Sequence, residues 1–153
     1  ITDERLEETM KTNIFGYFYM ARAALKHLKK GASIINTGSV TGLRGSQSLL
    51  DYSATKGAIH AFTMSLASSV LEKGIRVNAV VPGPTETEMV RRIEESRSPG
   101  APERTRAAVV AQIPLKRYGT AEELAQLIAF VASDAASFST GGVFAADGGL
   151  SAG

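Results

Sequence analysis

A tyrosine and a lysine four residues apart, Tyr52 and Lys56, have the types and spacing that most clearly indicate chemistry in this sequence. If Asp51 opens a helix, the two side chains lie on one face of it, and a phenol meets an ammonium group there. A cation beside a phenol favours the phenolate, so the hydroxyl can exchange a proton with a substrate oxygen near neutral pH. Ser39, thirteen positions before Tyr52, would donate a second hydrogen bond to that oxygen.

The same residues have simpler interpretations. Tyr and Lys at this spacing also occur by chance on solvated helices, and Ser39 could cap or end a strand. The context favours chemistry, because an apolar run over Ser33–Thr37 precedes the serine and a long amphipathic segment carries the pair.

The hydrophobic pattern predicts alternating helices and strands. A helix between two apolar strands indicates parallel strands joined by a right-handed crossover, which places the chain in the α/β class with a doubly wound sheet. The expected helices cover Asp3–Lys29, Asp51–Lys73 and Thr120–Ser133, and the expected strands cover Ser33–Gly38, Ile75–Val81 and Gly142–Ala146.

Residues 85–117 differ in character, because they are polar, rich in arginine and broken by prolines, and we expect them to form a lid over a site. The arginines fit a solvated face of that lid; a second interpretation is that some contact an acidic substrate or carrier. They are Arg91, Arg92, Arg97, Arg104, Arg106 and Arg117.

Composition narrows the class of protein. The 153 residues, 44% hydrophobic and 21% charged, fit a single soluble domain over 1–153, and the lack of cysteine suits the cytoplasm. A net charge of only +2, with basic residues scattered among acidic ones, argues against nucleic-acid binding. No apolar stretch reaches the ~20 residues needed to span a membrane. His27 and His60 lack metal-ligand spacing, so we expect no metal and treat both as structural or exposed.

Over its whole length the chain resembles the short-chain dehydrogenase/reductase family. Asn13, Ser39, Tyr52 and Lys56 look like that family's catalytic tetrad. The segment from Arg76 into Pro82-Gly83 resembles its strand and Pro-Gly turn, and Arg117 to Leu124 and Thr140 to Gly149 resemble its C-terminal third.

The resemblance implies a Rossmann-type fold and hydride transfer between NAD or NADP and a carbonyl or secondary alcohol. It implies that Tyr52 is the general acid or base, that Lys56 assists it and binds the nicotinamide ribose, and that Ser39 orients the substrate oxygen. Asn13 would hold a water that links Lys56 to solvent, through a local distortion of its helix. The residues implied to bind the cofactor are Tyr52, Lys56, Pro82, Gly83, Thr85 and Thr87, of which the last would meet the carboxamide. A homotetramer is the family expectation.

The sequence departs from the family pattern at two positions and lacks two of the family's features. Thr85 replaces a usual aliphatic residue, and Ala146 a usual valine or isoleucine. The Gly-rich turn that holds the pyrophosphate is missing, as is the residue that selects NAD or NADP. We therefore expect the chain to be a C-terminal portion whose first strand has a bare outer edge. It is then a fragment of a longer polypeptide, or it covers that edge by association.

Two other functions remain open. The chain could be a catalytically silent, truncated member that acts as an oligomerisation module, since its long helices, with Phe15, Phe18, Phe62 and Met64, resemble those that pair subunits. An epimerase or dehydratase of the related extended family would use the same Tyr and Lys, but the short tail after Asp147-Gly-Gly disfavours it. The substrate cannot be predicted from these residues.

Overall fold

Three parallel strands form the centre of the structure, a computed structural model that describes residues 1–152. They are β1 (Ser33–Thr37), β2 (Arg76–Pro82) and β3 (Val143–Ala146), hydrogen-bonded in the order β1-β2-β3. Ser33 lies opposite Arg76, and Ala79 lies opposite Val143. The three predicted strands and their parallel direction are confirmed, each to within one residue at either end.

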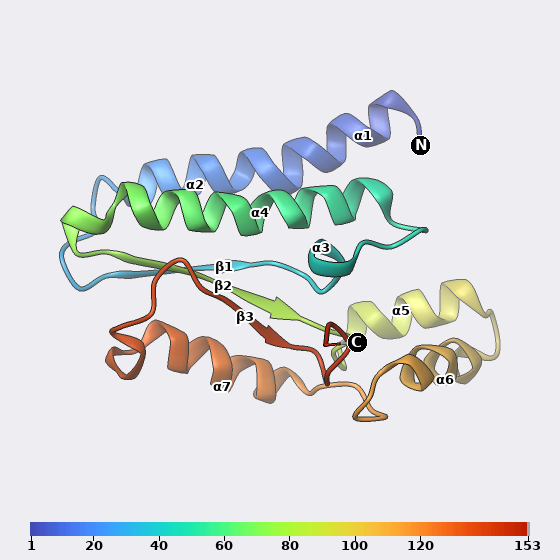
Figure 1. Ribbon diagram of the computed structural model, residues 1–153. Helices are drawn as coiled ribbons and strands as arrows, with labels where there is room; N and C mark the ends of the chain where they lie inside the picture. The colour runs from blue at the N-terminus through green and yellow to red at the C-terminus, as the bar shows by residue number, and fades with distance from the viewer. Residues whose placement is uncertain (153) are drawn as a thin grey trace.

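Helices cover both faces of the sheet (Figure 1). One face carries α1 (Asp3–Met10), α2 (Gly16–Ala24) and α4 (Leu50–Ser69), and the other carries α7 (Ala121–Ala132). This is the doubly wound α/β architecture that the sequence predicts. Around the strand ends lie α3 (Thr41–Arg44), α5 (Glu88–Arg97) and α6 (Pro102–Gln112). Within residues 1–152, no helix combines the length and apolarity that crossing a membrane requires.

The core lies on both sides of β2, because this strand is central in the sheet and has a helical layer above and below it. Every residue from Val77 to Val81 is buried, as expected for a parallel strand covered on both faces. Each fully buried aliphatic side chain contributes about 1.5–3 kcal/mol to folding. The cluster under α4 is Ala67, Val70, Ile75 and Val77, and the cluster under α7 is Val80, Leu124 and Val131.

The predicted helix over Asp3–Lys29 is wrong in two respects. It contains a π-helical segment, η1 (Lys11–Phe15), and α2 ends at Ala24 rather than at Lys29. After Ala24 the backbone tightens, and the N–H of His27 bonds to the Ala24 carbonyl three residues earlier. In this turn Leu25 and Leu28 pack against the core cluster under α4.

The predicted helix over Asp51–Lys73 is also divided. The helix α4 begins at Leu50 and ends at Ser69, and a 3₁₀ turn, η2 (Leu71–Lys73), follows. Buried Val70 leaves the helical conformation between them, and Gly74 then takes a left-handed φ of 65° that turns the chain into β2. By contrast, the predicted helix over Thr120–Ser133 is confirmed to within one residue at either end, and Thr120 and Glu123 form a full capping box at the start of α7. A second 3₁₀ turn, η3 (Asp134–Ala136), follows α7.

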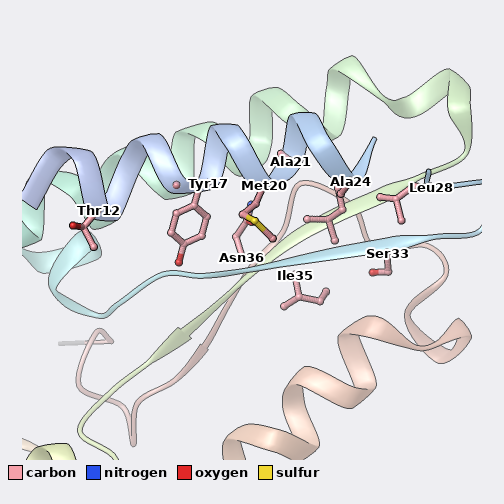
Figure 2. A pocket seen from close by; sticks show the side chains of 11 residues that line it. Thr12, Tyr17, Met20, Ala21, Ala24, Leu28, Ser33, Ile35 and Asn36 are labelled. Carbon is pink, nitrogen blue, oxygen red and sulfur yellow. The ribbon is translucent and has the colours of Figure 1, made fainter. Parts of the chain in front are cut away.

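Within residues 1–152, β1 bonds only to β2, so no strand lies along its outer edge. Between this edge and α2 lies a groove of about 490 Å³. Figure 2 shows Tyr17 and Met20 of α2 above the strand, with Ile35 pointing to the opposite face. The groove is largely apolar, so an exposed sheet edge and an apolar surface coincide here.

Arg76 at the start of β2 fastens the C-terminal end of α7. Its guanidinium donates four hydrogen bonds of 3.0–3.1 Å to backbone carbonyls. The last carbonyls of a helix lack internal partners and carry partial negative charge, so a cation that bonds them stabilises that end. The four acceptors are the carbonyls of Val131, Ala132, Ser133 and Ser139.

Replacing this guanidinium tests its contribution. We expect Arg76→Ala to lower the free energy of unfolding by about 2 kcal/mol, because charge-assisted bonds to partly buried carbonyls are lost. Urea denaturation of both variants measures the effect, with Arg92→Ala as the control. Arg92 forms only an exposed pair with Glu88, and its removal costs less than about 0.5 kcal/mol. Equal losses in the two variants would contradict the role given to Arg76.

Candidate active site

Lys56 lies at the centre of the candidate site, where α4 crosses the carboxyl end of β1. Its Nζ donates a 2.9 Å hydrogen bond to the carbonyl of Thr37, the last residue of β1. The same nitrogen lies 5.6 Å from the ring centroid of Tyr52 and 5.7 Å from that of Tyr17. The spacing of Tyr52 and Lys56 therefore brings a phenol and an amine together, as the sequence indicates. Lys56 is only 9% exposed, and burial lowers the pKa of its amine.

Tyr17 is a neighbour of Lys56 that sequence reasoning missed. Its hydroxyl donates a 2.9 Å hydrogen bond to the same Thr37 carbonyl. Burial raises the pKa of Tyr17, so its phenol remains a donor at neutral pH. The available signal was its position four residues after Asn13, but there it reads as part of the apolar stripe of the first helix.

Asn13 lies within η1, so the distortion expected around it is present as a π-helical turn. Its side-chain amide donates a 3.2 Å hydrogen bond to the Thr55 hydroxyl, which donates at 2.7 Å to the Tyr52 carbonyl. These contacts link the first helix to the turn of α4 that carries the phenol. Asn13 and Tyr52 share a surface depression of about 320 Å³ with Arg5, Glu8, Thr9, Thr12 and Asp51.

Asp51 does not open α4, which begins one residue earlier, but it fixes the first turn. Its carboxylate accepts a 2.8 Å hydrogen bond from the Thr9 hydroxyl and lies 3.7 Å from the Arg5 guanidinium. The Thr9 hydrogen bond, more than any other contact, lowers the pKa of Asp51. The residue directly before Tyr52 is thus anchored to α1.

Ser39 lies on the turn that joins β1 to α3. It is buried, and its Oγ accepts hydrogen bonds from the Thr41 amide at 3.3 Å and from the Thr41 hydroxyl at 3.1 Å. The expectation that Ser39 caps or ends an element is not met, because the N-cap of α3 is Val40 and β1 ends at Thr37; the Ser39 hydroxyl instead closes the turn between them. A group that accepts two bonds still has its own proton to donate, so this turn contact and a substrate contact are compatible.

The residues expected on the cofactor side follow β2. A Cβ on Gly83 would lie 2.6 Å from the Cα of Asp147, so only glycine allows this approach of the two strand ends. Thr85 donates a 3.0 Å bond from its hydroxyl to the Gly83 carbonyl. Thr87 caps α5, accepting from the Val90 amide at 3.3 Å. Thr87 thus caps a helix, whereas Thr85 closes the turn after Gly83.

Two helices, α5 and α6, make up most of the expected lid, and one arginine joins them. Arg106 of α6 donates two 2.7 Å bonds to the Glu86 carboxylate, just before α5. Glu94 of α5, 4% exposed, lies 3.3 Å from the Arg106 Nε and accepts a 3.5 Å hydrogen bond from the Arg106 Nη2. The guanidinium also stacks 4.8 Å from the Tyr118 ring, and burial, reinforced by Glu94, raises the pKa of Tyr118 to about 12.

The two histidines differ in position. His60 of α4 is buried, 5% exposed, which fits the structural interpretation, and His27 is exposed in the turn after α2. Burial, with the nearby Lys56 amine, lowers the pKa of His60. No group of three or more metal-binding side chains occurs in the part of the chain that the structure describes.

Comparisons with known proteins show which family the sequence resembles. A family model described as enoyl-(acyl carrier protein) reductase matches residues 1–151. Glucose and ribitol dehydrogenase of Daucus carota is 44% identical over 152 residues, 97% of this chain and 49% of that protein. The chloroplastic NADPH-dependent aldehyde reductase 1 of Arabidopsis thaliana is 45% identical, over 97% of this chain and 50% of that protein.

Solved structures show the same fold. A short chain dehydrogenase family protein of Francisella tularensis matches with a TM-score of 0.95 and 30% identity, covering 100% of this chain and 64% of that one. The aldohexose dehydrogenase of Thermoplasma acidophilum matches at 0.92 with 30% identity, covering 100% and 62%. The chain belongs to the short-chain dehydrogenase/reductase family and has its Rossmann-type fold. It spans about half the length of the curated relatives it matches.

Removing the arginine that joins α5 and α6 leaves the buried Glu94 without its counter-ion. We expect Arg106→Ala to lower the free energy of unfolding by about 2–3 kcal/mol, because an uncompensated buried charge is costly. Arg91→Ala is the matched control: Arg91 pairs with the same Glu86 at 3.4 Å but is exposed, and it contributes less than about 0.5 kcal/mol. Urea denaturation that ranks the two variants the other way round would show that the cluster does not hold these helices together.

Burial of His60 also predicts how stability changes with pH. Because its folded pKa lies below the ordinary value near 6.5, the unfolded chain binds the proton first as the pH falls. His60 therefore contributes a loss of stability as the pH falls through and below about 6.5. We expect His60→Gln to lose less unfolding free energy than the wild type between about pH 7 and about pH 5. His27→Gln, an exposed control, should follow the wild-type slope, and so would His60→Gln if the histidine were solvated.

Proposed function

We propose that this chain carries the catalytic half of a nicotinamide-dependent oxidoreductase that transfers hydride between NAD or NADP and a carbonyl or secondary alcohol. The supporting observation is the position of the Lys56 amine, 5.6 Å from the Tyr52 ring and bonded to the last carbonyl of β1. In open α/β sheets, ligands bind beyond the carboxyl ends of the strands, where this pair lies.

In this proposal Tyr52 exchanges a proton with the substrate oxygen, as acid in reduction and as base in oxidation. Lys56 places positive charge beside the phenol and favours the phenolate. Ser39 donates its hydroxyl proton to the same substrate oxygen and stabilises the charge that develops there. Asn13, bonded to Thr55, positions a water that connects Lys56 to solvent.

The nicotinamide cofactor, when bound, supplies the hydride chemistry. The residues that would hold it are Pro82, Gly83, Thr85 and Thr87, together with Tyr52 and Lys56. Their arrangement fits such a group, because the side-chain-free Gly83 and two hydroxyl residues follow the central strand at the sheet's carboxyl end. The pyrophosphate turn is not among the residues of this sequence, so we assign only the nicotinamide side of the site to it.

The names of the relatives suggest where to look for a substrate. They include a glucose and ribitol dehydrogenase, an aldehyde reductase and an aldohexose dehydrogenase. Sugars, polyols and aldehydes are therefore the substrates to test first. We also propose a cytoplasmic homotetramer in which α2 and α4 pair subunits; a groove of about 900 Å³ between these helices, lined by Phe18 and Phe62, supports the pairing surface.

An assembly module without catalysis is the second candidate function. The apolar groove between α2 and α4 favours it. The tight packing of Lys56 against Thr37 and two phenols argues against it. Burying an amine is unfavourable, and subunit assembly does not require an amine at this position.

Nucleotide binding and turnover separate the two functions. We expect the purified full-length gene product to bind NADH or NADPH and to reduce a test aldehyde. We expect Tyr52→Phe to bind nucleotide normally but to lose about 100-fold or more in kcat, because the transferable proton is gone. Fluorescence titration and steady-state rates measure this, and Tyr19→Phe, an exposed phenol of α2, is the control. A wild type that binds neither nucleotide would overturn the proposed enzyme.

A further inference from the structure

The imidazole of His60 lies inside the fold, one helical turn after Lys56. Only 5% of the residue is exposed, and its Nε2 is buried with no hydrogen-bond partner in residues 1–152. A hydrogen bond from Nε2 therefore does not account for the burial of this side chain. The ring instead packs against backbone on both sides of Ser39.

The ring contacts two glycines on either side of Ser39. A Cβ added to Gly38 would lie 2.3 Å from Nε2 and 2.8 Å from Cδ2 of His60, closer than any real contact. A Cβ on Gly42 would lie 2.9 Å from Cε1. The backbone of the turn thus rests directly on the imidazole, and the ring edge determines how near the turn approaches α4.

The other side of the turn is held by the sheet. The Gly38 amide bonds to the Val80 carbonyl at 2.8 Å, and the Val40 amide bonds to the Pro82 carbonyl at 3.1 Å. The turn is therefore fixed between β2, which bonds it, and His60, which limits its approach to α4. Tyr52 and Lys56 lie on that same helix, so the size of the imidazole sets the separation between the serine and the Tyr-Lys pair.

We propose that His60 is a positioning residue for the reaction, which acts by holding Ser39 at its working distance from Tyr52 and Lys56. The inference rests on the proposed function, since the distance matters only if the three side chains meet one substrate oxygen. A reacting group displaced by about 1 Å loses up to about 100-fold in rate. The residues after β2 that would hold the cofactor lie outside the turn that rests on this ring, so we expect nucleotide binding to change little.

Steady-state kinetics of the full-length gene product test this role. We expect His60→Ala to lower kcat by about 10-fold or more while the KM for nucleotide stays within about 2-fold. His60→Gln, whose side chain again reaches Gly38, should recover most of kcat. In a Ser39→Ala background the His60→Ala change should have little further effect, because the hydroxyl that it positions is already gone.

A stability measurement tests the contact without activity. Gly38→Ala should lower the melting temperature strongly alone, and less when combined with His60→Ala, because removal of the ring makes room for the methyl group. Gly42→Ala is the control. Its Cβ would also lie 2.6 Å from the Lys56 carbonyl carbon and 2.8 Å from the Gly57 amide nitrogen, so the loss of His60 should not rescue it.

The outcomes distinguish the two proposals. An active wild type whose kcat is unchanged in His60→Ala, or equally changed with and without Ser39, overturns the positioning role and leaves the proposed function standing. A kcat loss that His60→Gln does not recover, or a Gly38→Ala defect that His60→Ala does not relieve, also overturns it. A wild type that binds no nucleotide overturns the proposed function, and the positioning role falls with it.

Discussion

The buried amine of Lys56 is the interaction on which the rest of the site depends. Moving an ammonium out of water costs several kcal/mol unless the protein replaces its solvation. Here the Thr37 carbonyl, 2.9 Å away, and the faces of two phenol rings supply part of that replacement. Because Thr37 ends β1, the amine is satisfied only when α4 docks on the sheet in one rotation and one register. The contacts that compensate the buried charge of Lys56 therefore also fix the position of Tyr52.

Charge also holds together the segment predicted as a lid, residues 85–117. Glu86 lies between Thr85 and Thr87, and Arg106 joins it to the buried Glu94. Below these residues, Thr85 pairs with Gly119 in a parallel bridge, and the Glu86 amide bonds to the Gly119 carbonyl at 2.8 Å. A displacement of α6 is therefore transmitted through Glu86 to both threonines, so the packing of the lid and the geometry beside the strand ends are set together.

What the sequence predicts well is local. Apolar runs identify the three strands, the Thr120 and Glu123 spacing identifies the start of α7, and the spacing of Tyr52 and Lys56 places both beside each other. What it does not predict depends on contacts between distant residues. Tyr17 meets Thr37 twenty positions away, and Arg106 meets Glu86 at the same separation, so neither pair forms a pattern in the sequence. The helices of segment 85–117 were not predicted, because α6 has no apolar stripe and α5 has only a short one, Met89, Val90 and Ile93, among charged residues. The end of α2 at Ala24 was also not predicted, and beyond it Leu25 and Leu28 pack against the core.

The parallel sheet also determines the order in which the chain can fold. The pairing of Ser33 with Arg76, which brings β2 to β1, closes 43 positions, whereas the Asn78 to Gly142 bond that brings in β3 closes 64. Closing the longer loop costs about 0.4 kcal/mol more in chain entropy. We therefore expect β1, α4 and β2 to form the folding nucleus, with β3 and α7 adding late. Until β3 and α7 pack on the sheet, Val80 is exposed to solvent. The partly folded chain that forms before this late step is therefore the species most prone to aggregate.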